Sequence, residues 1–147
     1  MQDRFKVRVW NTLVKKFSYF DKPEMQIGTD GFDSGLIFPL SDNSNLYMGK
    51  YSEPQFCTGL KDKNCKLIYD GDILKYTSKP TNTQKNNPEY KPFTENYSVV
   101  WEDFYTGYNL RSKEKVNCFN LGIMTKDCEI IGNIHETPEL LKGNNNG

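Results

Sequence analysis

An aromatic and basic cluster offers the clearest binding chemistry in this chain. Trp101, Phe104, Tyr105, Tyr108 and Arg111 fall within eleven residues around a turn. Aromatic rings can stack on a base, and a guanidinium can hold a phosphate through paired hydrogen bonds. Trp101, Tyr105, Tyr108 and Arg111 are therefore the candidate ligand-binding residues. A second interpretation stays open, in which Trp101 and Phe104 belong to a barrel core beside an ordinary turn.

Acidic residues and the single histidine are the candidates for catalysis. Asp70 and Asp72 could act as an acid and base pair or as a metal clip, but they flank a glycine, which is typical of a tight turn. Glu102 and Asp103 are interpreted as surface charges. His135 has no nucleophile motif beside it, so we expect an exposed or capping imidazole. No catalytic residue is assigned, and no enzyme activity is expected.

The cysteines argue against a metal site. Cys57, Cys65, Cys118 and Cys128 show no CxxC spacing and have no companion histidine, whereas structural zinc sites usually bring ligands as closely spaced pairs. We expect four reduced thiols, some of them packed as small hydrophobes. The chain also lacks a phosphate-binding loop, a GxGxxG run and a GxSxG elbow, so no cofactor is expected.

Composition limits the classes of partner. A chain of 147 residues can form one domain with its own hydrophobic core. Nineteen basic residues balance 19 acidic ones, which disfavours nucleic acid as the main partner. No apolar stretch is long enough for a membrane helix, and the amino end alternates charged and apolar residues where a signal peptide needs an apolar run. We expect a soluble, cytoplasmic protein with no membrane partner.

The elements that position these residues begin with a β-rich lobe over 1–58. RFKVRVW, at positions 4–10, alternates basic and apolar residues, which predicts a half-buried strand. A turn at 11–12 and a returning strand over 16–20 complete a hairpin. The basic side chains on the solvated face of the first strand are Arg4, Lys6 and Arg8.

A small barrel is predicted over 59–142. GLKDKNCKLIYDGDILKY, at positions 59–76, reads as strand, turn, strand, turn and strand, with positive φ at Gly71. This regularity is explained by folding and needs no ligand. The residues expected to matter most for the structure are Gly59, Gly71, Ile73, Trp101, Ile131 and Gly132.

The rest of the barrel contains one long loop. Positions 77–92 are polar and include several prolines, which predicts a mobile loop. Further strands are expected over 96–103 and 129–134, and a short helix that Thr137 caps precedes a frayed tail at 143–147. The pattern as a whole predicts a mainly β barrel with one terminal helical turn.

Four sequence blocks carry a resemblance to a known family. FKVRVWN, TGLKDKNCKLIYDGDILKY, SVVWEDF and EIIGNIHETPELLK follow one another in the order and roughly the spacing of YopX-like proteins, which occur mostly in bacteriophages and prophages. One departure is Cys65, where the family's KDKNGK turn has glycine. Because cysteine is poorly suited to positive φ, we expect either Asn64 to take the left-handed position or the loop to differ locally.

The resemblance implies a mainly β fold with an SH3-like barrel in the carboxyl-terminal part, an irregular β-rich amino-terminal part, and assembly into homo-oligomers. It implies no catalytic activity, and fold analogy supplies none. It also implies that the protein is located in the cytoplasm of an infected or lysogenic bacterium.

Three functions remain in competition. The first is a non-enzymatic, oligomeric binding module that contacts itself and a host or phage protein. The second is an oligomeric sponge that sequesters a cyclic nucleotide used in antiphage defence. The third, disfavoured by the neutral charge, is a nucleic-acid-binding barrel.

Overall fold

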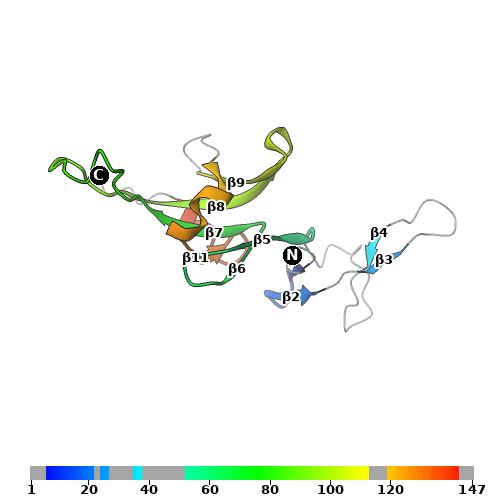
Figure 1. Ribbon diagram of the computed structural model, residues 1–147. Helices are drawn as coiled ribbons and strands as arrows, with labels where there is room; N and C mark the ends of the chain where they lie inside the picture. The colour runs from blue at the N-terminus through cyan, green and yellow to red at the C-terminus, as the bar shows by residue number, and fades with distance from the viewer. Residues whose placement is uncertain (1–5, 22–23, 27–34, 38–51, 113–118, 143–147) are drawn as a thin grey trace. The chain divides into compact units, whose positions relative to one another are not determined.

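The chain folds mainly as β-strands, which confirms the predicted fold class. It divides into two compact units, residues 1–59 and 60–147. Within the described part of the chain, no helix is long and apolar enough to cross a membrane. The computed structural model describes residues 6–21, 24–26, 35–37, 52–112 and 119–142 (Figure 1).

The first unit contains the predicted hairpin. β1 (Val7–Asn11) and β2 (Lys16–Phe20) pair as antiparallel strands. Asn11 Oδ1 accepts hydrogen bonds from the backbone N–H groups of Leu13 and Val14 at 3.0 and 3.1 Å. The asparagine side chain thus holds the turn that its position in the sequence predicts.

Arg8 departs from the prediction of a basic, solvated face. Its side chain is only 4% exposed, and β1 is buried along its whole length instead of on one face. The Nε of Arg8 donates to Gln55 Oε1 at 2.8 Å, and the guanidinium carbon lies 4.2 Å from the centre of the Phe17 ring. The hydrogen bond and the aromatic ring offset the cost of burying the charged guanidinium. Lys6 is partly exposed, and Arg4 lies outside the described residues.

Two further strands of the first unit, β3 (Glu24–Gln26) and β4 (Gly35–Ile37), pair with each other. β5 (Gln55–Lys61) begins beside β1 and runs into the second unit, where it is followed by β6 (Leu67–Tyr69). The strand order of this four-stranded sheet is β2-β1-β5-β6.

A five-stranded antiparallel sheet dominates the second unit and curls into a half-barrel. Its strand order is β10-β9-β8-β7-β11, so β8 is central, as predicted for its sequence. The strands are β7 (Asp72–Thr77), β8 (Thr94–Glu102), β9 (Gly107–Arg111), β10 (Phe119–Asn120) and β11 (Cys128–Asn133).

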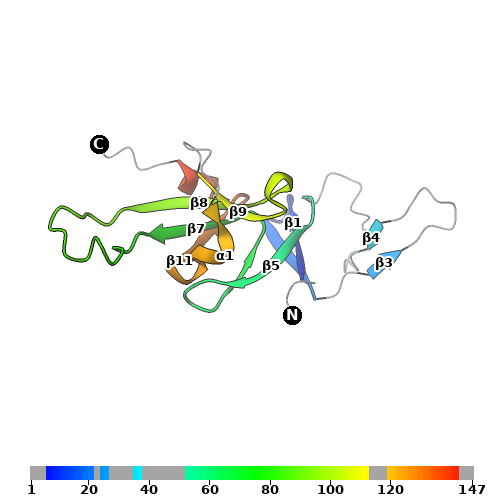
Figure 2. The same ribbon diagram turned by 45° about the horizontal axis from the view of Figure 1, so that its top comes forward.

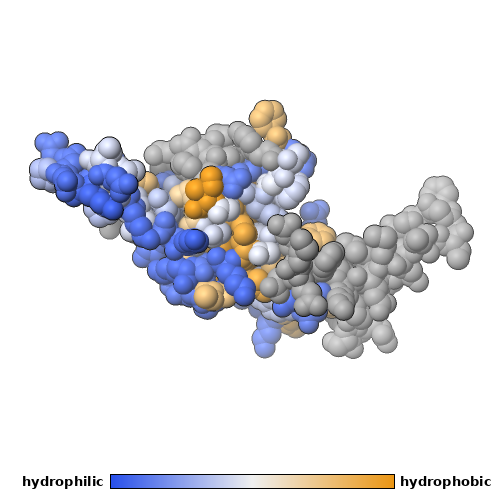
Figure 3. Space-filling model, viewed as in Figure 1, coloured by the Kyte–Doolittle hydropathy of each residue, from blue (hydrophilic) through white to orange (hydrophobic). Residues whose placement is uncertain are grey.

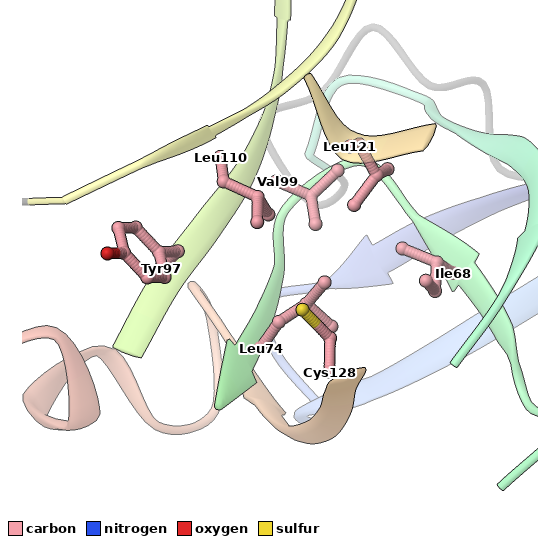
Figure 4. Packing of buried hydrophobic residues seen from close by; sticks show 7 residues of the cluster. All are labelled: Ile68, Leu74, Tyr97, Val99, Leu110, Leu121 and Cys128. Carbon is pink, nitrogen blue, oxygen red and sulfur yellow. The ribbon is translucent and has the colours of Figure 1, made fainter. Parts of the chain in front are cut away.

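The core of the second unit lies against this sheet. Alternation along β8 directs Tyr97 and Val99 inward, and both are almost fully buried. Figure 4 shows how these two side chains face the rest of the cluster, which comprises Ile68, Leu74, Leu110, Leu121 and Cys128.

Short helices connect the last strands. α1 (Leu121–Met124) and the 3₁₀ turn η4 (Thr125–Asp127) were not expected from the sequence. The 3₁₀ helix η5 (Pro138–Leu141) lies where a terminal helix was predicted, but Thr137 does not cap it. The Thr137 Oγ1 instead accepts a hydrogen bond from the backbone N–H of Asn133 at 3.2 Å, because the chain turns back at this point.

β7 and β8 continue into a projecting loop, residues 78–93, which we call the arm. It extends away from the sheet in both ribbon views (Figures 1 and 2), and its surface is mostly hydrophilic (Figure 3). The mobility expected for positions 77–92 stays a prediction. The arm nevertheless contains regular hydrogen-bonded turns, including Gln84 N–H to Thr81 O at 2.9 Å.

Candidate functional site

The candidate binding residues surround the turn between β8 and β9, which we call the hairpin end (residues 101–108). The two strands pair Trp101 with Tyr108, and the 3₁₀ turn η3 (Asp103–Tyr105) connects them. Thr106 follows η3 with a positive φ of 47° and leads into β9.

Aromatic side chains are exposed at the hairpin end. Trp101 is 51% exposed and Phe104 is 88% exposed. The rings of Trp101 and Tyr108 meet edge to face, with centroids 5.1 Å apart and an interplanar angle of 78°. The Trp101 Nε1–H donates to Asp103 Oδ1 at 2.9 Å, which fixes the orientation of the indole.

This exposure shows that the barrel-core interpretation of Trp101 and Phe104 is wrong. Trp101 has the same alternation phase as Tyr97 and Val99, so its side chain continues the inward face of β8. The covering core residues do not extend that far, and the indole emerges at the end of the strand. Phe104 lies beyond the strand altogether. Local periodicity indicates the direction of a side chain but does not reveal where the core ends.

Two carboxylates, Glu102 and Asp103, lie in the hairpin end, and the guanidinium of Arg111 comes from the other end of β9. Arg111 forms an ion pair with Glu102, and its side chain is half exposed. Asp103 accepts the indole hydrogen bond described above. The expectation that Glu102 and Asp103 are simple surface charges missed both interactions. The register places Arg111 opposite Ser98 and Glu102 opposite Gly107, so no cross-strand pairing rule indicated this ion pair.

The structure brings together two of the four candidate binding residues. Trp101 and Tyr108 are in contact. Arg111 is paired with Ser98, so it shares the opposite face of the hairpin with Glu102, which forms an ion pair with its guanidinium. Tyr105 lies in η3, and its side chain is outside what the structure describes. The arrangement offers exposed aromatic surface with adjacent negative charge, and its only guanidinium among the described residues is already engaged by a carboxylate. Whether these residues bind a ligand stays a prediction.

The acidic turn residues in the 59–76 motif serve the fold. Asp62 is buried, and its Oδ1 accepts hydrogen bonds from the backbone N–H groups of Asn64 and Lys66 at 2.8 and 2.9 Å. Its Oδ2 accepts from the N–H of Ile130 in β11 at 3.0 Å. The backbone N–H of Lys63 also donates to the carbonyl of Cys128 at 2.9 Å. This turn therefore ties the start of the barrel to its last strand.

Asp72 and Gly71 act in the same way in the second turn. Asp72 is buried, and its Oδ2 accepts from the backbone N–H of Tyr69 at 2.8 Å. Gly71 has a φ of 78°, as the sequence predicts, and its N–H donates to Val99 O at 2.9 Å. Its carbonyl accepts from the N–H of Ile134 at the same distance. The Asp72 carboxylate thus supports the backbone, which favours the turn interpretation over an acid and base pair.

Cys65 takes the left-handed position itself, with a φ of 63°. The alternative in which Asn64 adopts this conformation is wrong, because the hydrogen bonds to Asp62 fix the turn around the cysteine. The thiols of Cys57 and Cys128 are buried, whereas Cys65 is exposed. Burial, with the nearby carboxylates of Asp127 and Asp62, raises the pKa of Cys128 to about 11. A thiol in this state is a poor nucleophile near neutral pH.

The segment around His135 is also organised by backbone contacts. Asn133 is buried, and its Oδ1 accepts hydrogen bonds from the N–H groups of His135 and Glu136, each at 3.0 Å. Gly132 is packed so closely that an added Cβ would lie 1.9 Å from the Oγ1 of Thr137. These contacts account for Gly132, Asn133 and Thr137 of this segment.

Comparison with known proteins places these features in a family. A family model described as YopX protein matches residues 6–142, which include both units and the hairpin end. The chain belongs to the YopX family. This YopX chain is also similar in fold to protein EF1440 from Enterococcus faecalis, known from a crystal structure, with 23% identity and a TM-score of 0.51. That similarity covers 92% of this chain and 96% of the other. No curated protein matches the chain.

Proposed function

We propose that this YopX chain is a non-enzymatic, self-associating binding module of a phage or prophage. The family resemblance supports the phage origin. The structural support comes from one observation: the hairpin end exposes Trp101 and Phe104 beside Tyr108 instead of burying them. Tryptophan, tyrosine and phenylalanine are enriched where proteins bind one another, because they bury a large area at low entropic cost.

The chemistry of the hairpin end favours a protein partner over a nucleotide. A nucleotide phosphate needs a cation, but the Arg111 guanidinium is engaged by Glu102. The Asp103 carboxylate beside the indole adds further negative charge. An apolar or cationic protein segment suits this surface better, since its ammonium groups would meet the carboxylates and its apolar groups the rings.

Three ionisable groups of the second unit support the same conclusion. Asp62 and Asp72 each accept hydrogen bonds from buried backbone N–H groups, and their release would leave those donors without a partner. The raised pKa of Cys128 keeps that thiol protonated. In the folded state the two carboxylates are thus hydrogen-bonded to the backbone, and the thiol is protonated.

Native mass spectrometry of the protein taken directly from expressing cells tests this proposal. It reports the number of subunits and any retained ligand in one spectrum. We expect a multimer whose mass is a whole multiple of the polypeptide mass. A monomer at every concentration would contradict self-association, and a multimer that carries one nucleotide mass per site would replace the proposal with nucleotide sequestration.

A further inference from the structure

The arm is a built structure with its own hydrogen bonds. At its base, the Ser78 N–H donates to Phe93 O and the Phe93 N–H donates to Ser78 Oγ, both at 2.9 Å. Ser78 Oγ also lies 2.9 Å from the Tyr90 hydroxyl. Further out, the N–H of Asn87 donates to Gln84 O at 3.0 Å. The arm can therefore present side chains in a defined arrangement.

The arm carries the residue types that an aromatic and acidic surface recognises. Lys85 and Lys91 are exposed, whereas Lys79 forms an ion pair with Asp127 at the base of the arm. Proline rings pack flat against exposed aromatic rings, which is how proline-rich segments dock on aromatic-lined surfaces. A neighbouring lysine adds attraction to carboxylates and to the face of an indole. The exposed prolines of the arm are Pro80, Pro88 and Pro92.

The arm and the hairpin end complement each other but lie at opposite ends of β8. The strand runs from Thr94, beside the arm, to Glu102, in the hairpin end. Figures 1 and 2 show the two loops pointing away from each other. Nine strand residues at about 3.3 Å per residue separate them by roughly 26 Å. The arm of one copy therefore does not reach its own hairpin end.

We propose that the arm of one copy docks on the hairpin end of a second copy. This inference rests on the proposed self-association and names the two surfaces that meet. The prolines of the arm pack on Trp101 and Phe104, while Lys85 and Lys91 approach the Asp103 carboxylate beside the indole. Each copy thus uses its arm to bind one neighbour and its hairpin end to bind the arm of another.

Such a contact joins two different surfaces, so each copy can bind one neighbour through its arm and another through its hairpin end. An interface of this kind closes into a ring when the rotation between copies allows it, and otherwise continues as a chain. It also predicts that two defective variants can repair each other, provided that each has lost a different surface.

Sedimentation velocity on three full-length variants tests the docking. Lys85→Glu combined with Lys91→Glu alters the arm, and Asp103→Lys alters the hairpin end. The matched control combines Lys61→Glu with Lys66→Glu, which makes the same charge change on exposed lysines beside the β5–β6 turn. We expect the wild type and the control to assemble, and both the arm variant and the hairpin variant to associate at least about tenfold more weakly.

An equimolar mixture of the arm variant and the hairpin variant provides the decisive comparison. Each keeps one intact surface, and the two altered surfaces carry opposite charges, so the mixture should regain the assembly that neither variant forms alone. Because mixing cannot restore an unfolded chain, this result also shows that both variants are folded. Assembly of both variants like the wild type, or a mixture that stays monomeric, would overturn the docking and leave self-association standing. A monomeric wild type would overturn both.

Discussion

At the residue scale, Cys65 shows that the turn between β5 and β6 can form without glycine, at a cost in conformational free energy. The residue holds a φ of 63° because Asp62 fixes the turn from both sides through the N–H groups of Asn64 and Lys66. A side chain with a Cβ is disfavoured by roughly 1–2 kcal/mol in this conformation. The turn therefore contains local strain that glycine would relieve.

Cys65→Gly should consequently stabilise the protein. Relief of the strain exceeds the added entropy of glycine in the unfolded chain, so we expect a gain of about 0.5–1 kcal/mol in the free energy of unfolding. Urea denaturation measures this change. Cys65→Ser is the matched control, because serine keeps the strained φ and should leave the stability close to that of the wild type. An equal gain in both variants would mean that the thiol, and not the backbone, is responsible.

Cys128 gives stability a pH dependence. Burial raises the pKa of its thiol from 9.0 to about 11, so the folded state holds this proton more tightly than the unfolded state. The contribution of the protonated thiol to the free energy of unfolding is fully present below pH 9. It falls by up to roughly 2–3 kcal/mol as the pH rises from about 9 to 11. Urea denaturation at a series of pH values should show this decline, and Cys128→Ala should reduce its slope. A wild-type slope that Cys128→Ala leaves unchanged would contradict the assignment.

At the element scale, strands that follow local alternation could be predicted, and long-range contacts could not. β2 has the bounds that its sequence indicates, and the glycine turn before β7 has the expected positive φ. α1 was missed because four residues carry too little periodicity to signal a helix. The partners of Arg8 and Asp62 lie 47 and 68 residues away, so no local pattern reveals them.

Asp62 makes the most informative element-scale contact, because it joins the β5–β6 turn to β11. Asp62→Asn would place an amide where a carboxylate now accepts from three backbone N–H groups, so at least one donor loses its acceptor. We expect a loss of about 1–3 kcal/mol in the free energy of unfolding. Hydrogen exchange should show faster exchange at Ile130, whose N–H donates to the Asp62 Oδ2.

Glu129→Gln provides the control for Asp62→Asn at the same junction. It removes an ion pair of 2.6 Å with Lys63, in which both side chains are partly exposed to water. Exposed ion pairs contribute little to stability, so this variant should remain close to the wild type in urea denaturation. A similar loss in both variants would show that charge alone, and not the acceptor geometry of Asp62, holds the turn to β11.

At the scale of the whole molecule, the candidate site could be predicted only in part from the sequence. The closeness of Trp101 and Tyr108 in the chain correctly indicated neighbours in space, whereas Arg111 lies on the opposite face of the hairpin. Their exposure could not be predicted, because it depends on where the covering core ends. The engagement of Arg111 by Glu102 likewise depends on the strand register. These two features favour the first of the proposed roles, protein binding, over nucleotide binding.

Sedimentation equilibrium of Phe104→Ser beside Ile123→Ser tests the central claim most directly. Both side chains are highly exposed, at 88% and 83%, so neither change should unfold the protein, but only Phe104 lies in the hairpin end. We expect self-association to weaken about tenfold or more in Phe104→Ser, as is typical for a central aromatic contact, and to be unchanged in Ile123→Ser. Unaltered association of Phe104→Ser, or an equal loss in both variants, would contradict the hairpin end as the binding surface.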